Sequence, residues 1–468
     1  MTALGGLPGA AAAALSPVPE GPYGAVERIV PAEDAPRILM VARTGFDGED
    51  PGRQERHHLW AANDDGSNPV RLTGPAGTGD IIPIGITPDG ARVAWAERAP
   101  EPKSPLLYYR GTTDGAVKEL IGRGSSFPSA SLETAGTASL SDDGAIVALA
   151  RARAGTQGRA RTPSTSVRLV VAPWGSSTFR TTRRFSLLAS TNEYPSADGR
   201  VNCLVLRSAG GLRLATVGPD PLRVVVGPPR RTRLGNTTIC LTSNDGTTAV
   251  ALTDRAGRAH LLRRTGGRNS EFALPRFSRN GASLVGLSPT GRHALVSVRT
   301  DVPDTSGGAD QLVEIVDLQT RRARIIRLPF DAVDSPTALS DDGRYAVYVI
   351  RTPSRSVLWV VRLSSGQITK IPLEAGHSGT GVAFTPDSSR IVLSSSSVTS
   401  QKTISVDVRG AAPVILIART GTVTYVRTND GSRAWALYAP PFSSGPAAFR
   451  VPFWTLATAE IGRLPVVP

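Results

Sequence analysis

The histidines are the residues of this chain best suited to metal binding or acid–base chemistry. Imidazole nitrogens bind zinc and related ions, but several must converge on one point to form a site. We expect His57, His58 and His377 in loops on one face of the molecule. In contrast, His293 follows a tight turn on the opposite side, and His260 begins a predicted strand. A metal site built from the first three is one alternative, while the sequence itself identifies no metal ligand, no catalytic residue and no cofactor.

Short motifs that mark many enzymes are missing from the sequence. It contains no Gly-x-Ser-x-Gly elbow, no His-Glu-x-x-His pair, no Cys-x-x-Cys pair and no phosphate-binding glycine loop ending in lysine. A hydrolase of the Ser-His-Asp kind is therefore not indicated. The sequence favours a non-catalytic protein, although it leaves the question of an enzyme open.

Arginine supplies almost all of the positive charge. The chain has 53 Lys and Arg residues against 39 Asp and Glu, a formal net charge of +14. The arginines are scattered and do not form one stripe, which is typical of a basic, solvated surface and makes nucleic acid an unlikely partner. An alternative is an anionic polymer, bound with a steep salt dependence. The arginines of that alternative are Arg151, Arg153, Arg159, Arg161, Arg180, Arg183 and Arg184.

The elements that must position these residues are best seen between Leu339 and Pro372. The pattern predicts four short strands over 336–340, 345–350, 357–363 and 368–372. β-branched and aromatic residues fill these runs, while Asp, Ser and Gly fill the turns between them. This stretch therefore reads as one four-stranded sheet.

The turn between the first two strands recurs along the chain as Ser or Thr, two further residues that usually include Asp, and then Gly. A divergent copy spans Pro31–Pro36, ahead of a predicted strand over 37–42. The fourth residues of the other copies are 43 to 55 positions apart. These copies are Thr87–Gly90, Ser141–Gly144, Ser196–Gly199, Ser243–Gly246, Ser288–Gly291, Ser340–Gly343, Thr385–Ser388 and Thr428–Gly431.

A repeat of about 40–50 residues with four strands predicts the blades of a β-propeller. We expect an all-β chain with a single closed propeller of four-stranded antiparallel blades over residues 26–468. Nine units can be counted, but nine-bladed rings are uncommon, so eight blades are favoured within a range of seven to nine. Residues 1–25 are expected to be a flexible Ala/Pro/Gly-rich leader or the remnant of a signal peptide. No apolar run is long enough to span a bilayer.

The aspartates of the turns have a local explanation. Their carboxylates can accept hydrogen bonds from turn amides, and Gly takes the positive φ that other residues resist, so we expect turn formers and not metal ligands. Ser388 stands where Gly is usual, and that turn is expected to differ in shape.

The two cysteines, Cys203 and Cys240, fall in predicted strands. They form either a disulfide or two buried thiols, and the sequence leaves both alternatives open.

Leu59–Thr73, with its Leu-Trp strand, Asp-Gly turn and closing Arg-Leu-Thr, resembles the second half of a TolB-like, WD40-like (PD40-type) propeller repeat. The turns Thr87–Gly90 and Thr385–Ser388 resemble the other half. The resemblance covers about 26–465 and is weaker over 190–275. It implies the propeller fold and no single function, since similar repeats occur in TolB, in propellers of prolyl-oligopeptidase-like enzymes and in oligogalacturonide lyases. Nothing resembles the separate N-terminal domain of TolB.

The longest predicted loops mostly connect second to third strands, which places them on one face of a propeller. They span Thr44–His57, Arg98–Ser104, Arg151–Ser166, Thr300–Asp310 and Pro440–Ala447. Long loops on a rigid scaffold usually carry binding. We therefore predict a monomeric, extracytoplasmic or secreted binding or scaffold module that engages a protein, peptide or glycan. A cytoplasmic location is left open as an alternative. The alternative is a lyase or hydrolase acting on a carbohydrate or lactone.

The contents of these loops differ from one to the next. The first carries mixed charge, the loop after Arg151 is basic, the loop after Thr300 is acidic and the last contains Pro440-Pro441-Phe442. Ordinary solvated polarity is the favoured explanation for each of them. The charged residues of the first and the acidic loop are Asp47, Glu49, Asp50, Arg53, Glu55, Arg56, Asp301, Asp304 and Asp310.

Overall fold

The computed structural model describes the chain as a series of strands and the turns between some of them. The described residues are 16–17, 25–32, 34–44, 56–63, 66–74, 79–98, 106–122, 138–151, 165–187, 194–196, 200–208, 211–220, 222–226, 240–255, 258–266, 268–278, 282–303, 309–328, 337–351, 356–385, 387–397, 401–411, 413–418, 423–427, 433–438 and 455–460.

These residues form β-strands and no helix, so none of them forms a helix able to cross a membrane. Six sheets consist of four consecutive strands in chain order, each antiparallel to the next. Their strands are β2 (Ala25–Pro31), β3 (Arg37–Thr44), β4 (Arg56–Asn63) and β5 (Val70–Arg71); β6 (Asp80–Ile86), β7 (Arg92–Arg98), β8 (Leu106–Thr112) and β9 (Lys118–Ile121); β18 (Cys240–Thr242), β19 (Thr248–Arg255), β20 (Arg258–Thr265) and β21 (Arg268–Ser278); β22 (Ala282–Leu287), β23 (His293–Pro303), β24 (Ala309–Asp317) and β25 (Arg322–Leu328); β26 (Ala338–Leu339), β27 (Tyr345–Arg351), β28 (Ser356–Arg362) and β29 (Ile368–Pro372); and β30 (Ser378–Phe384), β31 (Arg390–Ser396), β32 (Gln401–Asp407) and β33 (Val414–Ala418).

An eight-stranded sheet follows β9 in the chain. It contains β10 (Ala138–Leu140), β11 (Ile146–Arg151), β12 (Thr165–Ala172), β13 (Arg180–Leu187), β14 (Tyr194–Pro195), β15 (Asn202–Ser208), β16 (Gly211–Gly218) and β17 (Arg223–Val226). Its halves, β10–β13 and β14–β17, are joined where Leu187 of β13 pairs with Leu206 of β15. By chain order this sheet therefore consists of two further sets of four strands.

The remaining sheet brings together the two ends of the described chain. It contains β34 (Val423–Arg427), β35 (Arg433–Tyr438), β36 (Thr455–Glu460) and β1 (Ser16–Pro17), which pairs antiparallel with β36. Of residues 1–25, expected to be a leader, β1 and the first residue of β2 are described. The pairing places chain segments from both ends in one sheet.

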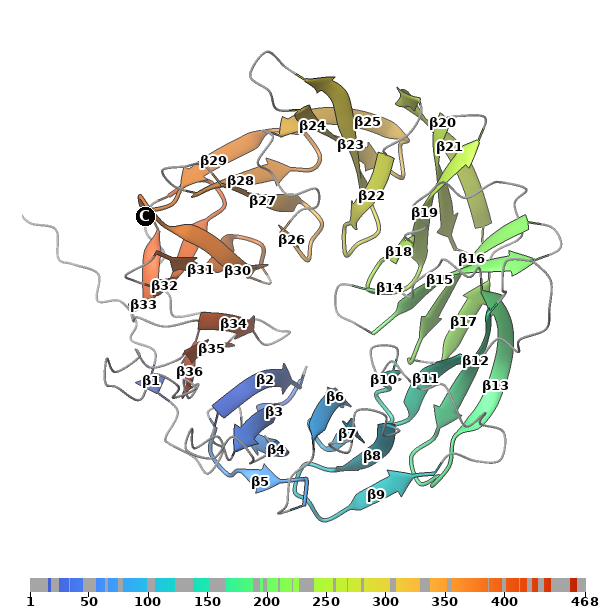
Figure 1. Cartoon of the computed structure of the whole chain (residues 1–468), viewed down its shortest axis with the longest axis vertical. Helices are drawn as coiled ribbons and strands as arrows, with labels where there is room; N and C mark the ends of the chain where they lie inside the picture. Colours follow the sequence, from blue (N-terminus) through green and yellow to red (C-terminus); the bar gives the residue numbers. More distant parts are fainter. Residues whose placement is uncertain are drawn as a thin grey trace, which may run out of the picture.

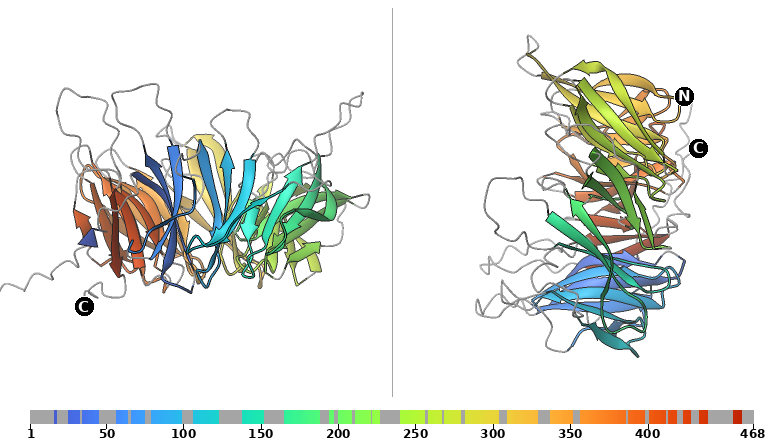
Figure 2. Two further views of the ribbon diagram at one scale, coloured as in Figure 1. Left: turned by 90° about the horizontal axis from the view of Figure 1, so that it is seen from below. Right: turned by 90° about the vertical axis from the view of Figure 1, so that its right-hand side faces the viewer.

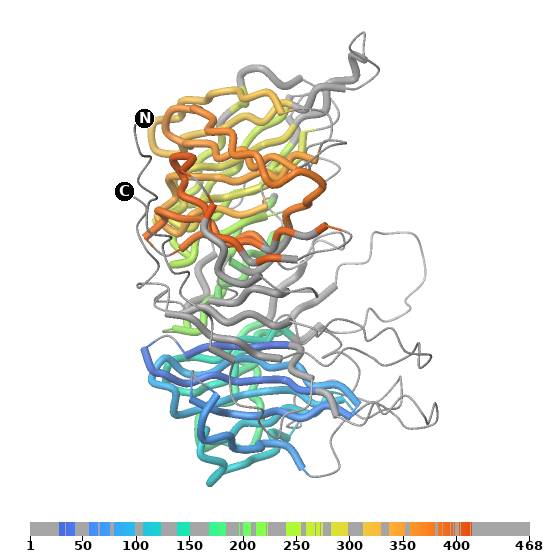
Figure 3. Tube along the Cα trace, turned by 90° about the vertical axis from the view of Figure 1, so that its left-hand side faces the viewer, coloured from blue at the N-terminus to red at the C-terminus, as the bar shows by residue number. Residues whose placement is uncertain are grey.

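All of the sheets are arranged around one axis, with the first strand of each set nearest to it (Figure 1). Seen edge-on, they stand side by side in a single layer (Figure 2). Consecutive sets of strands follow one another around the axis, and β34–β36 lie next to β2–β4 (Figure 1). In the side view the first sheets, in blue, and the later ones, in orange, lie at opposite ends (Figure 3). The expectation of an all-β chain with repeated four-stranded antiparallel sheets is confirmed.

The hydrophobic core lies between neighbouring sheets. Tyr108 of β8 packs in one cluster with Ile146 and Val170 of the next sheet, and Val347 of β27 shares another with Ile391 of β31. Central strands such as β7 and β27 have five consecutive buried residues, because both of their faces are covered. Each sheet therefore depends on its neighbours for burial, as expected of repeat architectures.

The recurring turn is built by one hydroxyl and one carboxylate. In Thr87–Gly90, the Thr87 hydroxyl donates to Asp89 at 2.5 Å and accepts from the Arg92 N–H at 3.0 Å. Gly90 has φ +70° and donates its N–H to the Thr87 carbonyl. The same hydroxyl–carboxylate pair occurs at Ser141–Asp143, Ser243–Asp245, Ser340–Asp342 and Thr385–Asp387. These aspartates are held by turn hydrogen bonds, as the sequence predicted.

The expectation that Ser388 changes the shape of its turn is wrong. Ser388 adopts φ +58° and donates its N–H to the Thr385 carbonyl at 2.8 Å, as Gly90 does to Thr87. Its side chain is buried. The surrounding sheet therefore imposes the left-handed conformation on a residue that resists it.

Acidic pH is expected to destabilise the protein through these turns. The Thr87 hydroxyl lowers the pKa of Asp89, and the Ser141 hydroxyl lowers that of Asp143, below the ordinary 3.8. A carboxyl whose pKa is lowered by folding stabilises the native state above its ordinary pKa and loses this contribution as pH falls through the folded value. The melting temperature should therefore fall as the pH drops below about 4. Circular dichroism melts will check this, and the Asp89→Asn/Asp143→Asn variant should show a smaller fall; an equal fall would contradict the prediction.

Candidate functional site

The histidines of the predicted loop face are each bonded to a different neighbour. His57 Nδ1 lies 3.0 Å from the Gly79 carbonyl oxygen. His58 is only 5% exposed, and its Nδ1 lies 3.4 Å from Thr73 Oγ1. Burial is the main cause of its lowered pKa, and the positive charge of Arg71 lowers the pKa further. His377 Nδ1 lies 3.0 Å from Ser395 Oγ. His57 and His58 thus lie in strand β4 and not in the loop expected from the sequence. The partner of His57 adjoins the first strand of the next sheet, whereas His58 and His377 contact residues of their own sheets.

The other two histidines are placed apart from these. His260 Nδ1 lies 3.5 Å from Glu271 in the neighbouring strand β21. His293 is buried at the start of β23, where burial is the main cause of its lowered pKa. Among the described residues no three His, Cys, Asp or Glu side chains are grouped so as to hold a metal. Nothing described therefore favours the lyase or hydrolase alternative, which stays a prediction.

Most of the predicted long-loop residues lie outside the described part of the chain. This applies to 45–55, 99–105, 152–164, 304–308 and 440–447, and hence to Arg153, Arg159, Arg161 and Asp304. Arg180 and Arg183 are described and lie exposed on β13. The binding face inferred from these loops and the anionic-polymer alternative both stay predictions.

A pocket of about 430 Å³ lies among the recurring turns. These turns are on the face opposite to the predicted loop face, and we call this cavity the turn-face pocket. It is bounded by turns of three consecutive sets of strands, β10–β13, β14–β17 and β18–β21. Its volume falls in the range of small-molecule sites. The residues that line it are Asp142, Arg200, Val201, Thr216, Gly218, Pro219, Asp220, Asn244, Asp245, Gly246, Thr247, Arg264 and Gly266.

Arg200 at one side of the pocket is neutralised by two carboxylates. It forms ion pairs with Asp142 and with Asp220. The Asp142 N–H also donates to Asp220 at 2.7 Å. Burial raises the pKa of Asp220, and the neighbouring charge of Asp142 acts in the same direction. This group ties the turn after Ser141 to the next set of strands.

Arg264 at the other side has no carboxylate partner among the described residues. It is 2% exposed, and burial lowers the pKa of its guanidinium. One terminal nitrogen donates to the Thr216 hydroxyl at 3.0 Å, while the buried Nε donates to no described group. The side-chain oxygen of Asn244, also in the pocket wall, is buried and accepts from no donor among the described residues. Two buried polar atoms therefore remain unsatisfied beside one cavity.

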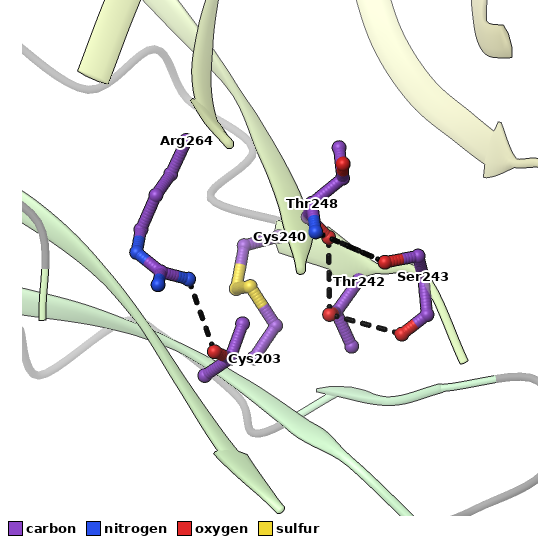
Figure 4. Close-up of a disulfide and its surroundings, with 7 residues drawn as sticks. Cys203, Cys240, Thr242, Ser243, Thr248 and Arg264 are labelled. Carbon is purple, nitrogen blue, oxygen red and sulfur yellow. Dashed lines mark hydrogen bonds between the residues drawn. A yellow bond between two sulfur atoms is a disulfide. The ribbon is translucent and has the colours of Figure 1, made fainter. Parts of the chain in front are cut away.

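A disulfide lies directly beside Arg264 (Figure 4). Cys203 of β15 and Cys240 of β18 are bonded, with their Cα atoms 5.9 Å apart, and both are buried. Cys203 is paired across the sheet with Thr216, the residue that accepts from Arg264. The disulfide and the Arg264–Thr216 bond thus cross the same boundary between sheets. Of the two alternatives for the cysteines, the structure shows the disulfide.

The pocket was not predicted from the sequence, although one signal was present. Arg263 and Arg264 are adjacent near the end of β20, so their side chains point to opposite faces of the sheet. Arg263 donates to the Leu318 carbonyl of the following sheet, and Arg264 to Thr216 of the preceding one. An Arg-Arg pair in a strand with both faces covered must bury at least one guanidinium.

Comparisons with known proteins show the fold class. No protein-family model and no curated protein sequence matches the chain. A crystal structure described as the eukaryotic initiation factor is similar over 86% of this chain and 90% of that chain, at 12% identity and a TM-score of 0.50. The dipeptidyl peptidase 4 of Porphyromonas gingivalis is similar over 81% of this chain and 57% of that chain, at 11% identity and a TM-score of 0.50.

At such identities the similarity concerns the fold alone. The chain has a β-propeller fold, to which the repeated four-stranded sheets already point. TolB from Acinetobacter baumannii matches over 73% of this chain and 80% of that chain, at 18% identity, but with a TM-score of only 0.28. The repeated four-stranded sheets support the resemblance to propeller repeats as to fold, while the particular repeat family stays a prediction.

Proposed function

We propose that this protein is an exported, monomeric, non-catalytic β-propeller that binds a protein, peptide or glycan on the face formed by the connections between second and third strands. One observation carries the proposal. From β2–β5 to β30–β33, clusters of buried apolar residues join each set of four strands to the next, as between β8 and β11–β12 or between β28 and β31. A scaffold of this kind holds its connecting loops in fixed relative positions, which is what a binding surface requires.

Export is supported by the disulfide. Disulfide bonds persist in oxidising compartments and are rare in the cytosol. Cys203 and Cys240 are the only cysteines of the chain, and both are used in the bond. The bond therefore fits a protein that matures outside the cytoplasm.

The proposal includes a closed ring of nine four-stranded blades. The described strands form nine sets of four when the eight-stranded sheet is divided at its Leu187–Leu206 junction. Nine blades is the upper limit of the range of seven to nine expected from the repeats. The sequence favoured eight blades only because nine-bladed rings are uncommon. The pairing of β1 with β36 supports closure, because a ring closed in this way fastens its last sheet to the start of the chain.

The binding face is tested by comparing matched arginine variants. Wild-type protein is screened on glycan and peptide arrays, and the affinity for the strongest ligand is then measured by calorimetry. Arg159→Ala/Arg161→Ala alters the predicted binding face. The control, Arg322→Ala/Arg409→Ala, alters exposed arginines at turns on the opposite face. We expect the first pair to weaken binding about tenfold, and the control pair to leave it unchanged.

Hydrogen exchange with the same ligand gives an independent result. Protection should appear at the ends of strands that lead into the second-to-third connections, such as those of β3 and β11. If protection is confined to the recurring turns, or if only the control pair weakens binding, the proposed face is wrong. Loss of binding on adding a chelator would instead favour the enzyme alternative.

A further inference from the structure

Arg264 is a buried cation whose charge no described residue balances. An arginine does not neutralise itself by losing a proton, so its charge persists when water is removed. Burying a charge without a counter-charge is unfavourable. Here the only described partner is the neutral Thr216 hydroxyl, and Nε makes no hydrogen bond within the described part of the chain. Because Arg264 also lines the cavity, an anion bound there would supply the missing charge.

Arg200, the second arginine of the pocket, does not compete for such an anion. Its guanidinium is paired with both Asp142 and Asp220. Asp245 is likewise occupied, since its carboxylate accepts from the Ser243 hydroxyl at 2.6 Å and from the Thr247 N–H at 3.0 Å. The positive charge available to a ligand is therefore concentrated at Arg264.

The side-chain oxygen of Asn244, the other unsatisfied atom, requires a hydrogen-bond donor and not an anion. Asn244 contributes a buried side-chain oxygen that accepts no hydrogen bond in the described structure, while its backbone N–H donates to the Pro289 carbonyl at 3.0 Å. A ligand must therefore place a hydrogen-bond donor near Asn244 and an anionic group near Arg264. A hydroxyl or an ammonium group meets the first requirement.

We infer that the turn-face pocket is a site for a small organic monocarboxylate that also carries a hydroxyl or ammonium group. A planar carboxylate matches the fork of donors of a guanidinium. The three carboxylates in the wall, Asp142, Asp220 and Asp245, repel a doubly charged anion such as phosphate, so a single negative charge is favoured. This site lies on the face opposite to the proposed binding face, and neither proposal depends on the other.

Calorimetry with defined probes tests the site. The probes are L-lactate and glycine, which carry both groups; acetate, which lacks the donor; lactamide, which lacks the charge; and inorganic phosphate. All are titrated into full-length protein at one ionic strength. We expect lactate or glycine to bind saturably in the millimolar range, as such small ligands do. Acetate should bind more weakly, and lactamide and phosphate should not bind.

Two pocket variants and one control variant connect that binding to the named residues. Arg264→Gln should weaken it about tenfold or more, because a charge-assisted hydrogen bond is lost. The matched control Arg263→Gln alters the neighbouring guanidinium, which donates to Leu318 outside the pocket, and should leave binding unchanged. Asn244→Leu should reduce the affinity for lactate to that for acetate.

The melting temperatures separate a ligand site from a purely structural arginine. If Arg264 only fastens the sheets together, Arg264→Gln will lower the melting temperature, and none of the probes will bind to the wild type. If the site is real, lactate will raise the melting temperature of the wild type and of Arg263→Gln but not of Arg264→Gln. Stronger binding of phosphate than of lactate, or equal binding by wild type and Arg264→Gln, would overturn the inference.

Discussion

Replacing both Cys203 and Cys240 by alanine is expected to lower the free energy of unfolding by about 4 kcal/mol. The two residues are 37 positions apart in the chain. A bond across a loop of that length removes many conformations from the unfolded chain, and the loss of this restriction is the main expected cost. The bond also fastens β15 to β18, so its removal should loosen the boundary between these two sheets, where the turn-face pocket lies.

Urea unfolding at pH 7, followed by circular dichroism, measures this effect. Wild-type protein unfolded with reductant present should resemble the double alanine variant, whereas the variant itself should not respond to reductant. The lactate affinity serves as a second readout, and we expect it to fall in the variant because the pocket wall is less firmly held. A loss below about 1 kcal/mol would show that the disulfide does not restrict the unfolded chain as the loop argument requires.

The strands and turns could be predicted because their signals are local. The predicted strand over 345–350 is observed as Tyr345–Arg351, and the predicted strand over 368–372 as Ile368–Pro372. Runs of β-branched and aromatic residues and the turn chemistry between them are properties of short stretches of sequence. The same reasoning failed at Ser388, where neighbouring strands override the preference of the residue itself.

The pocket could not be predicted because it depends on contacts between sheets. Whether Arg264 is buried is decided by Thr216 and by the disulfide, which belong to other strands. Nothing in the sequence distinguishes Arg263 from Arg264, so the sequence cannot show which of them will be buried beside the cavity. Conversely, His57 and His58, which the sequence places in a chemically suitable loop, lie in strand β4 and are bonded within their surroundings.

The role of the first residues was also beyond sequence reasoning. Ser16 and Pro17 carry no strand signal, and the segment around them resembles a flexible leader. Their pairing with β36 involves residues at the other end of the chain. A two-residue strand is specified by its partner and not by its own propensity, because tertiary context overrides such weak preferences.

A disulfide introduced between positions 16 and 458 is expected to form readily and to raise the free energy of unfolding by up to about 5 kcal/mol. Ser16 and Thr458 are Cα partners in the β1–β36 pairing. In a closed ring this bond joins the start of the chain to its last sheet, and so restricts nearly the whole unfolded chain. Each sheet of a ring is stabilised by its neighbours, so holding the last sheet in place should also slow unfolding.

The matched control is the pair Ser16→Cys/Ala457→Cys, because Ala457 is the partner of Pro17 and lies one residue out of register. Neighbouring residues of a strand face opposite sides, so this pair should oxidise slowly. Mass spectrometry after mild oxidation counts the bonds formed, and urea unfolding measures the stability. Equal oxidation of both pairs, or an in-register bond that leaves stability unchanged, would mean that β1 does not close the ring, and the propeller would then have to be held together by its inter-sheet cores alone.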